Sequence, residues 1–287
     1  MSRIDDALRR TAVRDGAQGA APAKSTVFVS AWGAAEETAH AEPVTARSFI
    51  PDAEPMEVSA LPAWSHVLVD SPRAPGHMNE QFRRLAGQLH QAQTERHMKL
   101  VMVTSAAAGD GKSLTAVNLA LALSGSYQRR VLLMDADLRH PSIAEIYGLS
   151  DRPGLSDALQ ARSEQKLPVI QLREGLTLLP AGRPNPDPMA GLSSERMQRI
   201  LRDASEHFDW IIVDGPPVGV VADATILAPA MDAVLFVVRA GVTSFRHVER
   251  ALEAVGKSRI FGVVLNAVDA DNLSDYGSYY SYGARRP

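Results

Sequence analysis

The 287-residue chain contains no cysteine. Disulfides and thiolate metal sites are therefore excluded, and the composition is compatible with a reducing compartment. The chain also lacks a basic excess, because 30 Lys and Arg stand against 33 Asp and Glu, for a formal net charge of −3. A general nucleic-acid binder normally carries a clear basic surplus, so we expect no nucleic-acid partner.

Long apolar runs are missing as well. No stretch approaches the roughly 18 apolar residues that a membrane-spanning helix needs, and the most apolar region, 211–238, is interrupted by Asp214, Asp223 and Asp232. The first ten residues, MSRIDDALRR, carry charges where a secretory signal would be apolar. We therefore expect that the chain does not span a bilayer and that any membrane association comes through a partner.

Three regions follow from the distribution of proline and of apolar periodicity. Residues 1–75 are predicted to form a short helix (2–10) and then a disordered, flexible linker, because seven prolines interrupt any pattern between residues 22 and 75. Within it, the apolar run 67–69 is a candidate for docking on the domain as an extended segment. Residues 76–270 are predicted to form one domain, and residues 271–287 a tyrosine-rich tail.

The domain alternates short apolar runs with helical patterns, which predicts an α/β fold with a mostly parallel, doubly wound sheet and helices on both faces. The strands are expected at 99–104, 130–135, 176–179, 209–214, 232–238 and 260–266. The helices are expected at 78–97, 112–125, 141–147, 154–160, 193–207, 222–230 and 244–256.

The segment 105–113 reads SAAAGDGKS between a predicted strand and a predicted helix, the context of a P-loop. Lys112 is expected to reach the β- and γ-phosphates of ATP, and the Ser113 hydroxyl to ligate Mg²⁺. Ala106 stands where the strict pattern has glycine, and a glycine-containing turn with a chance lysine is the alternative. The predicted nucleotide-binding residues are Ala108, Gly109, Asp110, Gly111, Lys112, Ser113 and Leu114.

Two further apolar runs end in aspartate: VLLMDADLR (131–139) and WIIVDGPPV (210–218). Carboxyl ends of parallel strands meet at the ligand crevice, so Asp135, Asp137 and Asp214 are expected to converge near the P-loop. We predict that Ser113, Asp135 and Asp214 serve the metal. Arg139 is expected to pair with the aspartates or with a phosphate. The alternative for a single strand-end aspartate is a helix N-cap.

The motifs GDGKS, LLMDADLRHP and WIIVDGPPV together resemble the bacterial tyrosine kinases of capsule and exopolysaccharide synthesis, over roughly residues 78–282. These are P-loop proteins close to the Min and Par partitioning ATPases. The resemblance implies a protein-tyrosine autokinase that uses ATP and Mg²⁺. It also implies a separate transmembrane chain-length or co-polymerase activator, a tyrosine phosphatase, and self-association. The implied localisation is cytoplasmic and peripheral at the inner membrane through that activator. The implied catalytic residues are Lys112, Asp135, Asp137, Arg139 and Asp214, with Asp137 as the candidate to orient or accept the tyrosine proton.

One family motif is incomplete. Members often carry Glu-x-x-Arg-x-x-Arg before the P-loop for ring assembly, and this chain has Glu80 and Arg83 but Ala86 at the last position. Arg84 is a candidate to substitute for it. The three residues predicted to act in oligomerisation are therefore Glu80, Arg83 and Arg84.

Four of the six tyrosines lie close together near the end of the sequence, among glycines and serines. The resemblance implies that Tyr276, Tyr279, Tyr280 and Tyr282 are autophosphorylation sites. Because several phosphates on one short segment are easier to place in trans, we expect the tail to enter the site of a neighbouring copy. A passive low-complexity segment is the alternative.

Two other functions remain open on the sequence. One is a Min- or Par-like ATPase switch, although Ala107 occupies the position of that family's signature lysine. The other is a non-catalytic nucleotide-binding partner of a polysaccharide export complex.

Overall fold

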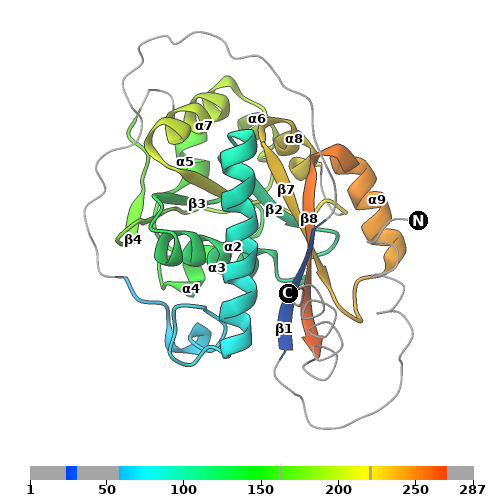
Figure 1. The fold of residues 1–287 in the computed structure, drawn as a ribbon. Coiled ribbons are helices and arrows are strands. Elements are labelled where there is room, and N and C mark those ends of the chain that lie inside the picture. The colour runs from blue at the N-terminus through cyan, green and yellow to red at the C-terminus, as the bar shows by residue number, and fades with distance from the viewer. Residues whose placement is uncertain (1–23, 31–57, 162, 164, 220–221, 270–287) are drawn as a thin grey trace.

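The computed structural model describes residues 58–161, 163, 165–219 and 222–269, and the backbone of 24–30. It is an α/β fold built on one eight-stranded sheet of order β1-β8-β7-β2-β6-β3-β5-β4 (Figure 1). The strands are β1 Lys24–Ser30, β2 Leu100–Ser105, β3 Val131–Asp135, β4 Ile170–Arg173, β5 Leu176–Leu179, β6 Trp210–Asp214, β7 Ala233–Arg239 and β8 Ile260–Asp269.

The six strands predicted from the sequence form the parallel centre of this sheet, so the predicted fold class is confirmed. Both edges are antiparallel: β1 pairs with β8, and β4 pairs with β5. These two edge strands were not predicted. The register between β3 and β6 sets Asp135 opposite Asp214 at the carboxyl end of the sheet.

The helices alternate with the strands as predicted, with ends that differ by a few residues. They are α2 Gly76–Arg96, α3 Lys112–Ser126, α4 Ile143–Ile146, α5 Leu155–Gln160, α6 Met189–Leu192, α7 Glu195–His207, α8 Asp223–Leu227 and α9 Phe245–Val255, with short 3₁₀ helices at Pro62–Trp64, Ala228–Ala230 and Lys257–Arg259. The four-residue α6 was not predicted. The helix predicted at 2–10 lies outside the described residues.

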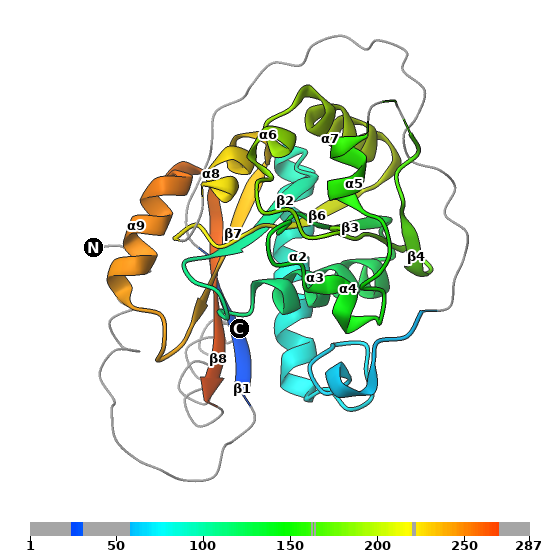
Figure 2. The same cartoon turned by 180° about the vertical axis from the view of Figure 1, so that it is seen from behind.

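Two apolar cores lie on opposite faces of the sheet. Helices α2, α3 and α4 cover one face (Figure 1), and α5 to α9 cover the other (Figure 2). Side chains alternate between the two cores along each strand, as the period of two requires: in β2, Val101 and Val103 join one core and Met102 the other. This coverage leaves the ends of the strands as the place where polar groups gather.

Part of the stretch predicted to be a flexible linker lies on the domain. Leu68 is 2% exposed, and Asn118 of α3 binds the backbone on both sides of it, by accepting from Val69 N and donating to Val67 O, each at 2.8 Å. Residues 67–69 therefore dock on the domain as predicted, but in a bend and turn and not as the extended segment that was expected. Because β1 is also paired into the sheet, the linker prediction is wrong for two segments, 24–30 and 58–75.

No helix in the described part of the chain combines the length and the apolar character that crossing a bilayer requires.

Candidate functional site

The P-loop connects β2, which ends at Ser105, to α3, which begins at Lys112. Gly109 and Gly111 have positive φ angles of 84° and 95°. At Gly111 an added Cβ would also lie 1.9 Å from the Asn266 Nδ2 atom, so only glycine fits. Ala106 has no positive φ and is buried, which explains why alanine is tolerated where the strict motif has glycine.

Contacts from the neighbouring strands hold this loop. The Asp110 carboxylate accepts from Ala107 N at 3.1 Å and from Thr243 Oγ1 at 2.5 Å. Asn266 Nδ2 donates to Asp110 O at 2.8 Å, and Arg239 Nη1 donates to Gly109 O at 3.3 Å. Sequence reasoning did not identify Arg239, Thr243 or Asn266. Their only signal was position: Arg239 and Thr243 lie at or just beyond the carboxyl end of β7, and Asn266 lies in the carboxyl-terminal half of β8.

Lys112 is buried where the aspartates meet. Its Nζ lies 2.8 Å from Asp137 Oδ2 and 3.7 Å from Asp214 Oδ1, and it donates to Ser113 Oγ at 3.2 Å. Burial disfavours the charge, but Asp214 and Asp137 outweigh it and raise the pKa of Lys112 above its usual value. The predicted convergence of the strand-end aspartates on the P-loop is therefore present in the structure.

Asp135 is fully buried and serves the backbone. Its Oδ1 accepts from Asp137 N, and its Oδ2 accepts from Ser142 N and Ile143 N, each at 3.2 Å. The helix-capping alternative is thus realised at the start of α4. Burial and then the neighbouring Asp214 raise the pKa of Asp135 to about 8, against the effect of Lys112.

Asp214 differs from Asp135 because neither of its carboxylate oxygens has a hydrogen-bond partner among the described residues, although the side chain is fully buried. Burial raises the pKa of Asp214, and Lys112 opposes this rise. A buried carboxylate without hydrogen bonds is costly. Its presence fits a site in which a cation or ordered water completes the set of contacts.

The residues fit a magnesium-nucleotide site in particular. Mg²⁺ in such sites is usually held by one or two carboxylates, waters and the substrate's phosphates, without an all-protein cage. Among the described residues no three His, Cys, Asp or Glu side chains are grouped as such a cage. Ser113 Oγ and the unsatisfied Asp214 would hold the ion. Asp135 already accepts three backbone bonds, so its predicted metal role stays a prediction.

Arg139 does not pair with the site's aspartates, and this part of the prediction is wrong. Its Nε lies 2.6 Å from Asp223 Oδ2, its Nη2 lies 3.2 Å from Asp223 Oδ1, and its Nη1 donates to Pro186 O. The bidentate geometry suits a guanidinium and a carboxylate. The pairing joins the loop after β3, the loop before α6 and the start of α8.

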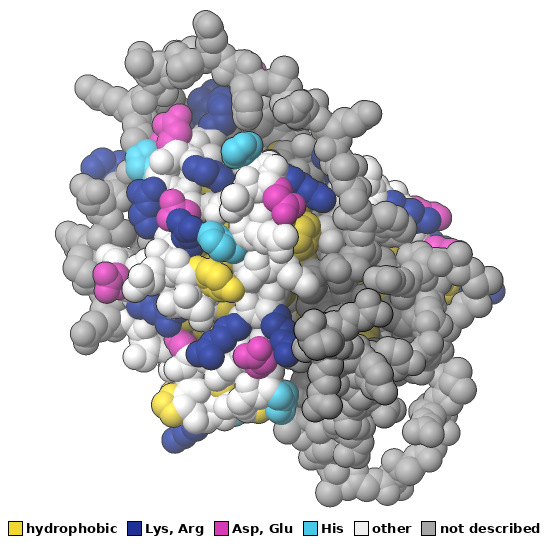
Figure 3. All heavy atoms as spheres, viewed as in Figure 1, with side chains coloured by type: hydrophobic (Ala, Val, Ile, Leu, Met, Phe, Trp, Pro, Cys, Tyr) yellow, Lys and Arg dark blue, Asp and Glu magenta, His cyan; other side chains and the backbone are white. Residues whose placement is uncertain are grey.

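The remaining predicted residues lie apart from this cluster. Glu80, Arg83 and Arg84 are exposed on α2, where Arg84 Nε lies 3.2 Å from Glu80 Oε1. Figure 3 shows that basic, acidic and histidine side chains intermingle on the face that includes α2. Tyr276, Tyr279, Tyr280 and Tyr282 lie outside the described residues.

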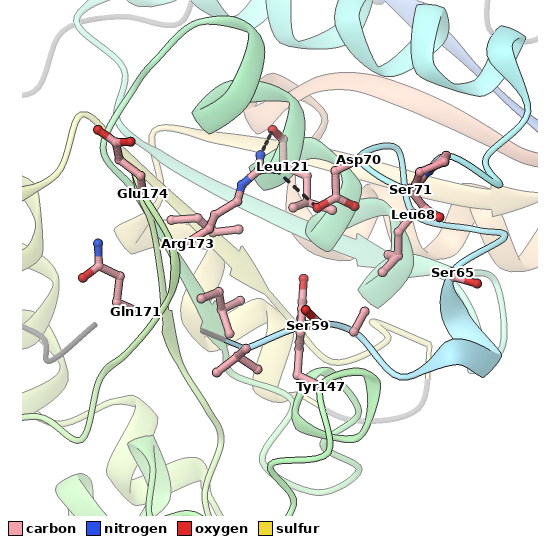
Figure 4. A pocket seen from close by; sticks show the side chains of 15 residues that line it. Ser59, Ser65, Leu68, Asp70, Ser71, Leu121, Tyr147, Gln171, Arg173 and Glu174 are labelled. Atoms are coloured by element: carbon pink, nitrogen blue, oxygen red, sulfur yellow. Dashed lines mark hydrogen bonds and ion pairs between the residues drawn. The ribbon is translucent and has the colours of Figure 1, made fainter. Parts of the chain in front are cut away.

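A separate cavity of about 700 Å³ lies between the segment 58–72 and β4, and no P-loop residue lines it. Figure 4 shows Tyr147 pointing toward Asp70 there, while Arg173 reaches Asp70 and the Leu121 carbonyl oxygen. Burial, and then the Asp70 charge, raise the pKa of Tyr147.

Comparisons with known proteins agree with this site. Residues 96–274 match the family model described as "ParA: NUBPL iron-transfer P-loop NTPase". The chain is 36% identical over 204 residues to the tyrosine-protein kinase YwqD of Bacillus subtilis (strain 168), which covers 70% of this chain and 86% of YwqD. It is 31% identical over 221 residues to the succinoglycan biosynthesis transport protein ExoP of Rhizobium meliloti (strain 1021), over 75% of this chain but 28% of ExoP.

Among solved structures, the kinase domain of the Escherichia coli tyrosine kinase ETK aligns with a TM-score of 0.63 and 28% identity, over 67% of this chain and 76% of that structure. The shared fold, the P-loop lysine among strand-end aspartates and the relatives named as kinases lead to one assignment. The chain belongs to the ParA-type P-loop NTPases and, within them, to the bacterial tyrosine-protein kinases.

Proposed function

We propose that the chain is an autokinase that transfers the γ-phosphoryl group of Mg-ATP to Tyr276, Tyr279, Tyr280 and Tyr282 of a neighbouring copy. The observation that carries the proposal is the position of Lys112 between Asp137 and Asp214, beside Ser113. The tyrosine segment follows β8, and Asn266 of that strand contacts the P-loop. The described strand that precedes the tyrosines thus touches the nucleotide site.

The residues divide the chemistry between them. Mg²⁺ supplies charge neutralisation on the phosphates, with Ser113 and Asp214 as its proposed ligands. Lys112 leaves Asp137 to contact the β- and γ-phosphate oxygens, which releases Asp137 Oδ2. The tyrosine oxygen then bonds to the γ-phosphorus, the bond to the β–γ bridging oxygen breaks, and ADP leaves. The phenolic proton, with a usual pKa of about 10, passes to Asp137.

Transfer between copies is supported by the length of the acceptor segment. Six residues lie between Asp269 and Tyr276, so the Cα atoms of these two residues are at most about 25 Å apart. Three more tyrosines follow at different distances. To phosphorylate all four tyrosines in the active site of the same copy, this short segment would have to adopt several different conformations. Each phosphate adds up to about two negative charges, so we propose that repulsion drives copies apart after they assemble through Glu80, Arg83 and Arg84.

The proposed biological role is regulation of exopolysaccharide or capsule polymerisation and export. It is supported by the likeness to ExoP, whose name places that protein in succinoglycan transport. A transmembrane chain-length or co-polymerase activator would bring the kinase to the inner membrane, and a tyrosine phosphatase would reset it.

Mass spectrometry after phosphatase treatment and incubation with Mg-ATP tests the proposal. We expect phosphate on the four tyrosines of the wild-type chain and none on Lys112→Met. Direction is tested by mixing Lys112→Met, as acceptor, with a donor in which all four tyrosines are replaced by phenylalanine. Phosphate on the acceptor supports transfer between copies.

Each opposite result has a defined meaning. Modification of wild-type chains alone, but never of the mixed acceptor, overturns transfer between copies and leaves the autokinase intact. Release of free phosphate with an unmodified tyrosine segment, both alone and with the cytoplasmic part of an activator, overturns the autokinase.

A further inference from the structure

The Ser142 hydroxyl reaches across the site to the P-loop. Ser142 is the N-cap residue of α4, yet its side chain makes no capping hydrogen bond. Instead its Oγ donates to Ser113 Oγ at 2.8 Å, over a separation of 29 residues. A serine at this position would ordinarily accept from an amide of the first turn, so its use here calls for another explanation.

Asp135 takes over the capping task. Its Oδ2 accepts from Ser142 N and from Ile143 N, which satisfies donors at the start of α4. The Ser142 hydroxyl is thereby free to bond elsewhere. Through its amide and its hydroxyl, Ser142 joins two groups that sequence analysis assigned to the metal, the Asp135 carboxylate and the Ser113 hydroxyl.

We propose that Ser142 is a positioning residue that orients the Ser113 hydroxyl toward the magnesium ion of the bound nucleotide. This inference rests on the proposed function only in taking Ser113 as a magnesium ligand. A serine side chain has three staggered rotamers and its oxygen two lone pairs. The bond from Ser142 occupies one lone pair and selects one rotamer. The other lone pair accepts from Lys112 Nζ here, and it has a fixed direction when Lys112 turns to the phosphates.

The hydroxyl is tested by calorimetric titration of ADP into the full chain, once with Mg²⁺ and once with EDTA. We expect Ser142→Ala to lower the affinity for ADP about tenfold with Mg²⁺, as loss of outer contacts to a metal ligand commonly does. With EDTA the affinity should stay within about twofold of wild type. Ser205→Ala, which removes a hydroxyl bonded to Leu201 O on α7, is the control and should change neither value.

Two matched variants separate orientation from packing. Ser142→Thr retains a hydroxyl and should bind Mg-ADP nearly as wild type does, whereas Ser142→Val has the same shape without one and should lose about tenfold. Equal losses with and without Mg²⁺, or equal affinities for the Thr and Val variants, overturn the proposal. If the alanine variant folds poorly, the comparison of the Thr and Val variants still tests whether the hydroxyl at position 142 is needed.

A double-variant cycle shows whether Ser142 acts through Ser113. If it does, Ser113→Ala with Ser142→Ala should bind Mg-ADP no more weakly than Ser113→Ala alone. Additive losses overturn the proposal. Because the measurement is binding of ADP, its outcome is independent of whether any tyrosine accepts phosphate.

Discussion

Two buried aspartates have opposite surroundings: Asp214 is the last residue of β6, and Asp223 is the first residue of α8. Asp223 is 1% exposed and accepts two hydrogen bonds from Arg139. Asp214 is fully buried and neither of its oxygens makes a well-formed hydrogen bond among the described residues. Lys112 Nζ lies 3.7 Å away, and Lys112 and the Ser113 hydroxyl both oppose the rise in the Asp214 pKa. A satisfied buried charge fixes loops in place, whereas an unsatisfied one lowers stability and is retained for a ligand. At this edge of the sheet, the Asp223–Arg139 pair therefore belongs to the scaffold, the residues that hold the loops in place. Asp214 belongs to the reactive part, the residues proposed to bind the nucleotide and its metal.

The largest effect is expected from Asp214→Asn. We predict a fall in tyrosine phosphorylation of about 1,000-fold, equivalent to roughly 4 kcal/mol of transition-state stabilisation, because a proposed magnesium ligand loses its charge. The nucleotide-free protein should be as stable as wild type or more so, since a buried carboxylate without well-formed hydrogen bonds is removed. Phosphorylation rates measure the predicted loss of activity, and urea unfolding measures the predicted stability. A stability loss like that of a scaffold residue would contradict the comparison.

Arg139→Ala should show the reverse balance. Asp223 is buried but the Arg139 side chain is 24% exposed. Removing Arg139 leaves the Asp223 charge unpaired, and we expect the free energy of unfolding to fall by about 2–3 kcal/mol. Urea unfolding measures it, with the exposed Arg202→Ala as the control. Adding Asp223→Asn should recover part of the loss. If Arg139→Ala unfolds like wild type but loses nucleotide affinity, Arg139 belongs to the reactive part.

Stability should also depend on pH in a way set by the reactive carboxylates. Asp135 has a folded-state pKa of about 8, above its unfolded value of 3.8, so the folded state binds more protons between these values. Stability of the nucleotide-free chain should therefore fall as pH rises from 5 to 8, by up to about 1.4 kcal/mol per pH unit. In Asp214→Asn this slope should be shallower, because a charge that raises the Asp135 pKa is gone. Equal slopes in urea unfolding would count against the coupling.

The smallest effect on stability is expected at the surface. Arg84→Ala breaks an exposed pair with Glu80, and such pairs contribute under about 1 kcal/mol. Self-association should nevertheless weaken if α2 is the assembly face, as sedimentation velocity would show. Lys257→Ala, which breaks the similarly exposed pair with Glu253 on α9, should leave association unchanged.

Sequence reasoning succeeded where local pattern decides structure. The P-loop glycines, the six central strands and the three aspartates follow from periodicity and from the rule that carboxyl ends of parallel strands share an edge. The partner of Arg139 did not follow, because Asp223 and Pro186 are brought to it only by the fold. Asn266 was missed for the same reason, because no sequence motif links it to Gly111, which it approaches only in the folded chain.

The two missed edge strands show another limit. The sequence signal for the β4–β5 hairpin was the glycine at position 175. Glu174 and Gly175 form the two-residue turn, and Gly175 has a φ of 76°. The run TVFV (26–29) is typical of a strand, but it stands alone among prolines and small residues. Short strands of this kind depend on a neighbouring strand, and a single-segment pattern does not reveal the neighbour. The division of the whole chain at residues 75 and 270 stays a prediction.

The pairing of β1 with β8 has a practical consequence for experiments on shortened chains. Cutting at the predicted boundary, residue 75, removes β1 and leaves the backbone N–H and C=O groups of one side of β8 without partners. An open edge of this kind recruits strands from other molecules. A trimmed kinase would then aggregate or pair edge to edge, and that artefact would imitate the assembly proposed for α2.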